Sequence, residues 1–152
     1  MKKWIVLILM FGIVGCSQTD ANATNILDDP GVDQLVNTLG YEVQLPTKLP
    51  FEPDSTEADI DSGNQQLNIH LRNEDYGVID VFIVKGPVTY KGAETEEGTT
   101  PAGRSVQYRG NEDGHTLRFE QKGIHYQVSS LSFDGQTALK KEQLMEMIDN
   151  FE

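Results

Sequence analysis

The feature that most constrains the fold is a pair of alternating segments near the C-terminus, joined by a two-residue turn. In residues 115–121 and 124–131, apolar and polar side chains alternate, which is the pattern of strands with one buried side. The turn at 122–123 contains a glycine, which tolerates the positive φ that such a turn requires. This turn fixes the register of a hairpin in which Phe119 faces Tyr126 on the buried side.

The rest of the chain predicts more strands and a helix at each end. Alternation or apolar runs predict strands at 41–45, 56–61, 67–72, 78–84 and 105–109. Segment 78–84 is apolar except for Asp80, which is typical of a central strand covered on both faces. Asp29 and Pro30 start a helix that Gly40 ends, and apolar spacing predicts a second helix over 139–150. We therefore expect an α+β fold: a single antiparallel sheet of about six strands, with the N-terminal and C-terminal helices packed on one face.

Residues 86–104 contain four glycines and two prolines, and like charges cluster among them. This composition predicts a long irregular loop without a regular element. Loops of this length often serve binding, and the alternative is an insertion without function. We take its acidic part, together with the polar side of the hairpins, as the candidate surface for a basic protein partner. The candidate residues are Glu94, Glu96, Glu97, His70 and His125.

The N-terminus predicts an export signal and a lipid anchor. Lys2 and Lys3 precede an apolar run at 4–15, which is too short to span a bilayer and has the flanks of a signal peptide. The four residues Ile-Val-Gly-Cys that end at Cys16 resemble the lipobox of bacterial lipoproteins. This resemblance implies cleavage after the signal peptide 1–15, a lipid on the Cys16 sulfur, and a location on the extracytoplasmic side of the cell membrane. The alternatives are an ordinary secretory leader with an accidental cysteine, or an uncleaved signal anchor.

Behind the anchor we expect a flexible tether at 16–28 and one domain at 29–152. The chain has a net charge of −12, and removal of a leader with two lysines and no acidic residue changes it to −14. Such a charge repels phosphate backbones, so we expect no nucleic-acid partner, whereas it attracts basic protein surfaces. The alternative explanation of the charge is solubility alone. We expect a monomer.

The chain contains the motifs Leu45-Pro46-x-x-Leu49-Pro50, Leu117-x-Phe119, Tyr126 and the helix start Lys141 to Leu144. These motifs and the order of elements resemble domain-of-unknown-function family 4367, which occurs in extracytoplasmic lipoproteins and regulators of Gram-positive bacteria. The resemblance covers about residues 36–151. It differs at Phe119, where the family often has tryptophan. The family has no catalytic residues to transfer, so the resemblance implies a fold and a compartment.

The sequence contains no nucleophile motif, no phosphate-binding loop and no pair of histidines at metal-ligand spacing. The hairpin registers place His125 opposite Glu120 and His70 opposite Asp80. A carboxylate beside an imidazole serves either a proton relay or an ordinary cross-strand charge pair.

Asp59 and Asp61 precede a glycine, as in a calcium loop, but the closing glutamate of an EF-hand is absent, which makes them weak metal candidates. We expect no enzyme activity and no cofactor. The predicted function is a membrane-anchored protein-interaction or regulatory module, and the alternative is a lipoprotein that binds a cation or a small solute.

Overall fold

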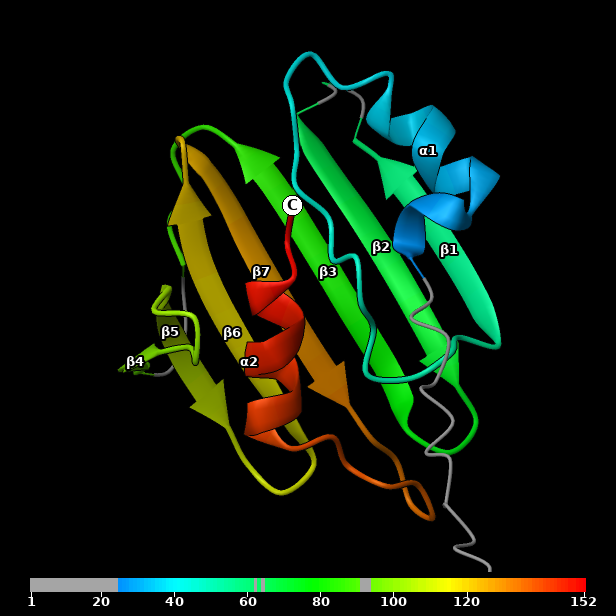
Figure 1. Ribbon diagram of the computed structural model, residues 1–152, viewed down its shortest axis with the longest axis vertical. Coiled ribbons are helices and arrows are strands. Elements are labelled where there is room, and N and C mark those ends of the chain that lie inside the picture. Colours follow the sequence, from blue (N-terminus) through cyan, green and yellow to red (C-terminus); the bar gives the residue numbers. More distant parts are fainter. Residues whose placement is uncertain (1–24, 62, 64, 91–93) are drawn as a thin grey trace, which may run out of the picture.

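The computed structural model describes residues 25–61, 63, 65–90 and 94–152 (Figure 1). The predicted signal peptide, Cys16 and most of the predicted tether lie outside the described residues. No helix within the described ranges is long and apolar enough to cross a membrane.

The described residues form one open antiparallel sheet of seven strands, in the order β1-β2-β3-β7-β6-β5-β4 (Figure 1). This confirms the predicted α+β class, with seven strands instead of about six. Six strands agree with predicted segments to within one residue at each end. The strands are β1 (Ser55–Ile60), β2 (Gln66–Asn73), β3 (Gly77–Lys85), β4 (Glu96–Thr99), β5 (Ser105–Gly110), β6 (Gly114–Gln121) and β7 (Ile124–Leu131).

β4 corrects the prediction that residues 86–104 form only an irregular loop. It pairs with β5, with Gly98 opposite Val106, and the Thr100 N–H donates to the Arg104 carbonyl at 2.9 Å in the turn between them. The residues of β4 have a low intrinsic preference for strands. Pairing with β5 satisfies their backbone groups, so tertiary context overrides the local preference.

The hairpin of β6 and β7 has the predicted register, with Phe119 opposite Tyr126. Lys122 and Gly123 both adopt positive φ, at 54° and 75°. The Phe119 and Tyr126 rings stack with centroids 4.6 Å apart, and the Phe151 ring lies edge-on to Phe119 at 5.3 Å. These three rings pack against one another within the core.

The helices are η1 (Ile26–Asp28), α1 (Pro30–Val36) and α2 (Lys141–Asp149). Asp29 caps α1 as predicted, because its carboxylate accepts hydrogen bonds from the Gly31 and Val32 N–H groups at 2.8 and 3.3 Å. α1 packs on β1 and β2, whereas α2 packs on β6 and β7, and both lie on the same side of the sheet (Figure 1). We call this side of the sheet the covered face and the opposite side the open face.

The prediction of a strand at residues 41–45 is wrong. This segment runs between the two helices over the covered face (Figure 1), and it has no ladder partner among the described strands. Leu45 and Glu152 exchange backbone hydrogen bonds at 3.2 Å, and the Gln44 N–H donates to the Tyr126 hydroxyl at 3.2 Å. The segment therefore buries Leu45 against the sheet but is not itself a strand of the sheet.

β3 is also less enclosed than predicted, because only one of its two sides is fully buried. Ile79, Val81 and Ile83 point to the covered face and are buried, while the alternate residues, among them Asp80 and Phe82, lie on the open face and are half-buried. Neither α1 nor α2 covers them. The polar side chains of the neighbouring strands shield Phe82, since its register partners are asparagine and glutamine.

Candidate functional site

The open face carries a row of side chains that crosses all seven strands. Strand register places seven residues side by side in this row, and all but one of them are polar or charged. Such rows arise because alternate residues of each strand point to the same face. In strand order from β1 to β4 the row is Asp59, Asn68, Phe82, Gln127, Arg118, Gln107 and Glu97.

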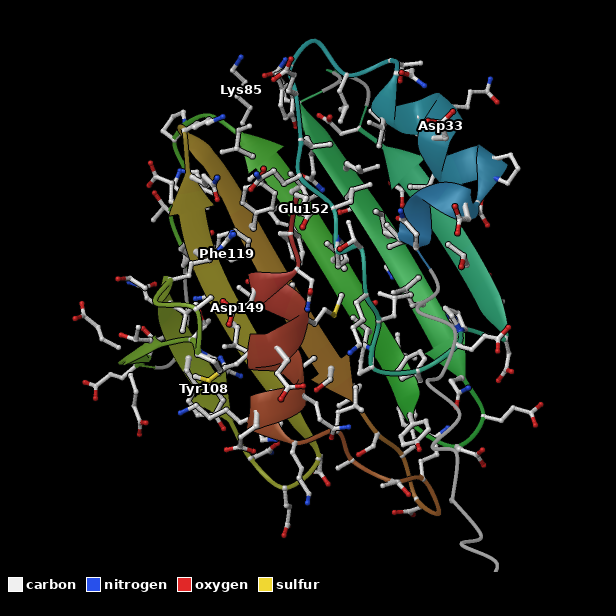
Figure 2. All side chains as sticks on the ribbon, in the orientation of Figure 1. Asp33, Lys85, Tyr108, Phe119, Asp149 and Glu152 are labelled. Carbon is white, nitrogen blue, oxygen red and sulfur yellow. The ribbon has the colours of Figure 1, made fainter. Side chains whose placement is uncertain are left out.

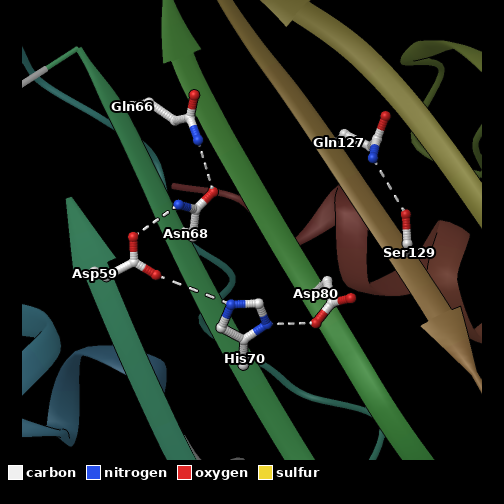
Figure 3. A network of polar contacts seen from close by, with 7 residues as sticks. All are labelled: Asp59, Gln66, Asn68, His70, Asp80, Gln127 and Ser129. Carbon is white, nitrogen blue, oxygen red and sulfur yellow. Dashed lines mark hydrogen bonds and ion pairs between the residues drawn. The ribbon is translucent and has the colours of Figure 1, made fainter. Parts of the chain in front are cut away.

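The half of the open face on β1, β2 and β3 carries a chain of polar contacts (Figure 3). The His70 Nδ1 atom lies 2.7 Å from the Asp80 carboxylate, and its Nε2 atom lies 4.0 Å from that of Asp59. The Asn68 side chain donates to Asp59 at 2.9 Å and accepts from Gln66 at 3.2 Å. The predicted pair of His70 and Asp80 is confirmed, and we call these five residues the polar network.

Asp61, the other candidate for calcium binding, holds a turn between β1 and β2. Its carboxylate accepts hydrogen bonds from the Gln65 and Gln66 N–H groups at 2.9 Å each. These backbone hydrogen bonds lower the pKa of Asp61. The described part of the chain contains no group of three or more His, Cys, Asp or Glu residues that could hold a metal ion.

The half of the open face on β4 to β7 contains a cleft of about 510 Å³, which we call the Tyr90 cleft. Tyr90 belongs to the connection between β3 and β4. Its ring lies over the Arg118 guanidinium, 4.1 Å from ring centroid to Cζ, and meets the His125 ring edge-on at 6.4 Å. Burial raises the pKa of Tyr90, and the charge of Arg118 opposes this effect. The polar lining includes Tyr90, Glu97, Gln107, Arg118, Glu120 and His125.

Arg118 is the cation of this cleft, and it has no carboxylate partner. Its Nε–H donates to the Gln127 side chain at 2.7 Å. The ion pairs of the described residues all use histidine, and none includes Arg118. The His125 Nδ1 atom lies 3.8 Å from the Glu120 carboxylate, which confirms their predicted register. The two terminal nitrogens of Arg118 therefore have no hydrogen-bond partner among the described residues.

The structure separates the predicted candidate residues. Glu97 and His125 line the same cleft, whereas His70 belongs to the polar network on β2. Glu96 lies opposite Tyr108, one position along β4 from Glu97, so it points to the other side of the sheet. Glu94 is exposed and lies before β4.

The lining residues that the sequence interpretation missed include Tyr90, Gln107 and Arg118. Register could have identified Arg118, because it lies two residues before Glu120 and therefore on the same face of β6. Gln107 follows in the same way, because it is the register partner of Arg118 on the next strand. No sequence signal places Tyr90, since it lies in a connection without a repeating pattern.

β4 forms a wall of the cleft, and a residue of α2 on the covered face holds the turn that follows this strand. The Asp149 carboxylate at the end of α2 accepts hydrogen bonds from the Ala102 N–H at 2.9 Å and from the Thr100 hydroxyl (Figure 2 shows Asp149 on α2). Arg104 donates to the Gln121 side chain at 3.0 Å. The C-terminal end of α2 thus holds the turn that returns β4 to β5.

The cleft combines an aromatic ring, an unpaired guanidinium and two carboxylates, which are groups suited to holding a small polar molecule. Comparison of the chain with protein-family models, with curated proteins and with solved structures finds no match.

Proposed function

We propose that the chain is a membrane-anchored extracytoplasmic binding module that presents the open face of its sheet to a basic protein partner. The observation that carries this proposal is the position of the two helices, which both cover the same side of the sheet (Figure 1). The lipobox at Cys16 and the resemblance to family 4367 support the anchor and the compartment. The proposal includes no reaction and no cofactor.

Charge supports the choice of a basic partner. On the open face, the strands carry five carboxylates and three arginines. The net charge of the chain, −12, has the same sign and steers basic surfaces toward the domain. The carboxylates are Glu57, Asp59, Asp80, Glu97 and Glu120, and the arginines are Arg72, Arg109 and Arg118.

Site-specific photo-crosslinking in intact cells tests the docking face. A photoreactive amino acid replaces Glu57 or Arg109 on the open face, and in matched controls it replaces Glu42 or Glu146, which are exposed on the helix side. We expect cross-links to a basic protein from the open-face positions, and fewer of them at high salt. Cross-links that form only from the helix side contradict the proposal.

The anchor is tested by Cys16→Ala, with Thr19→Ala as the control. We expect the Cys16→Ala protein to lose incorporation of labelled fatty acid and to keep the mass of its precursor, whereas the control behaves as the wild type. A Cys16→Ala protein that stays in the membrane fraction at its mature mass contradicts the lipid anchor.

A second candidate function, the binding of a small solute, is favoured by the Tyr90 cleft. Its volume of about 510 Å³ and its converging polar groups suit a small molecule. The cleft shares Glu97, Glu120 and Arg118 with the charged surface of the open face. The photo-crosslinking positions Glu57 and Arg109 lie outside the cleft, so the two functions can be tested separately.

A further inference from the structure

We propose that the Tyr90 cleft binds a small zwitterion of the amino-acid type, with its carboxylate on Arg118 and its ammonium group on Glu120. This inference rests on the second candidate function and names its ligand class.

The first observation is that the Arg118 guanidinium has hydrogen-bond donors without a partner. The ring of Tyr90 covers one of its faces, and its Nε–H is already bonded to Gln127. Arg118 lines the cleft, and its two terminal nitrogens have no partner among the described residues. A guanidinium with both terminal nitrogens free matches a carboxylate, which it can bind through two parallel hydrogen bonds.

The second step is the presence of carboxylates in the same cleft. Glu120 lies two residues after Arg118 on the same face of β6, at a Cα separation of about 7 Å. Glu97 lies two strands away in the same row as Arg118, at about 10 Å. Neither forms an ion pair with Arg118, so the cleft presents separate positive and negative groups.

The charges of the cleft therefore disfavour ligands that carry a single charge. A plain anion on Arg118 meets the repulsion of Glu120, and a plain amine on Glu120 meets the repulsion of Arg118. A molecule that carries a carboxylate and an ammonium group close together pairs with both. Tyr90 strengthens these interactions because it shields the guanidinium from water on one side.

Three probes of matched size test the charge requirement on the wild-type domain. Alanine has both charged groups, propionate lacks the ammonium group, and ethylamine lacks the carboxylate. Binding is followed by the backbone amide signals of the labelled protein in NMR titrations at millimolar concentrations. We expect alanine to shift the signals of Arg118, Glu120 and His125, with a dissociation constant about tenfold lower than that of either analogue.

Alanyl-alanine, titrated in parallel, distinguishes the source of the zwitterion. Tighter binding of alanine points to a free amino acid, and tighter binding of the dipeptide points to a short peptide. Both results support the ligand class, provided that the single-charge analogues bind more weakly.

Variants then assign the two charged groups. Arg118→Lys keeps the charge but loses the two-point contact, and Glu120→Gln removes the negative charge; each is expected to weaken alanine binding about tenfold. Arg109→Gln is the matched control, because it removes an exposed arginine of the same face outside the cleft. Its dissociation constant should equal that of the wild type.

Propionate that binds as tightly as alanine overturns the inference, as does the absence of any shift with all probes. Unchanged binding in Arg118→Lys and Glu120→Gln overturns it too. None of these results affects the photo-crosslinking test of the open face, so failure of the ligand class and failure of the protein-binding proposal remain distinguishable.

Discussion

On β6, Phe119 points to the helices and is 5% exposed, whereas Arg118 and Glu120 on either side of it point to the open face. The same contrast runs along β3 and β7, where apolar residues on the covered face are buried and the alternate residues are half-buried. On the covered face the side chains exclude water, which stabilises the fold. On the open face they contact one another and solvent. Substitutions on the two faces should therefore affect different properties of the protein.

The sharpest test of this contrast exchanges one phenylalanine on each face for alanine. Phe151 is 3% exposed and packs edge-on against two aromatic rings, so Phe151→Ala should lower the free energy of unfolding by about 3–5 kcal/mol. Phe82 is half-buried on the open face, and Phe82→Ala should cost about 1 kcal/mol. Urea denaturation followed by circular dichroism measures both. Equal losses would show that both faces stabilise the fold to the same degree.

Asp149 lies on the covered face, and its carboxylate holds the turn beside β4, the wall of the cleft. Asp149→Ala removes the acceptor of the Thr100 hydroxyl and the Ala102 N–H, and should cost about 1–3 kcal/mol because Thr100 is buried. Hydrogen exchange should become faster in β4, the wall of the cleft, and stay unchanged in β2. The control Glu146→Ala changes an exposed residue of the same helix and should alter stability by less than about 0.5 kcal/mol. Unchanged exchange in β4 would mean that the cleft wall is independent of α2.

His115, on the covered face, should make the free energy of unfolding depend on pH. Its Nδ1 atom lies 2.9 Å from the Tyr108 hydroxyl, and burial lowers its pKa below the ordinary value of 6.5. As the pH falls through 6.5, His115 takes up a proton in the unfolded chain before it does so in the folded protein. The free energy of unfolding therefore decreases until the pH reaches the lowered pKa of His115 in the folded state. Stability measured just below pH 6.5 should depend less on pH in His115→Gln than in the wild type. An equal dependence in both proteins would assign the effect to other groups.

The sequence predicted those parts of the fold that local turns determine. The turn at Lys122 and Gly123 sets the register of β6 and β7, and from it follow the pairs of Phe119 with Tyr126 and of Glu120 with His125. The helix cap at Asp29 is equally local, because one side chain bonds two nearby N–H groups. Such features need no knowledge of distant residues.

The parts that the sequence did not predict depend on distant contacts. β4 forms because β5 pairs with it, and residues 41–45 are extended because the end of the chain bonds to Leu45. The residues of the candidate site likewise divide into those that the sequence predicted and those that it did not. Glu97 and His125 were identified, but Tyr90 belongs to a segment without a repeating pattern, so its place in the cleft could not be predicted.

The smallest predicted effect concerns the polar network of the open face. The His70 and Asp80 side chains are 39% and 50% exposed, so water screens their contact at 2.7 Å. A double-mutant cycle with His70→Gln and Asp80→Asn should give a coupling energy of about 0.2–1 kcal/mol, and added salt should reduce it. The cycle is measured by urea denaturation of the wild type, the two single variants and the double variant. A coupling above about 2 kcal/mol, as in a pair shielded from water, would break the contrast between the faces, because the open face would then stabilise the fold as well. A coupling in the expected range leaves the network as a surface whose side chains can exchange their contacts for those of a partner at little cost to the fold.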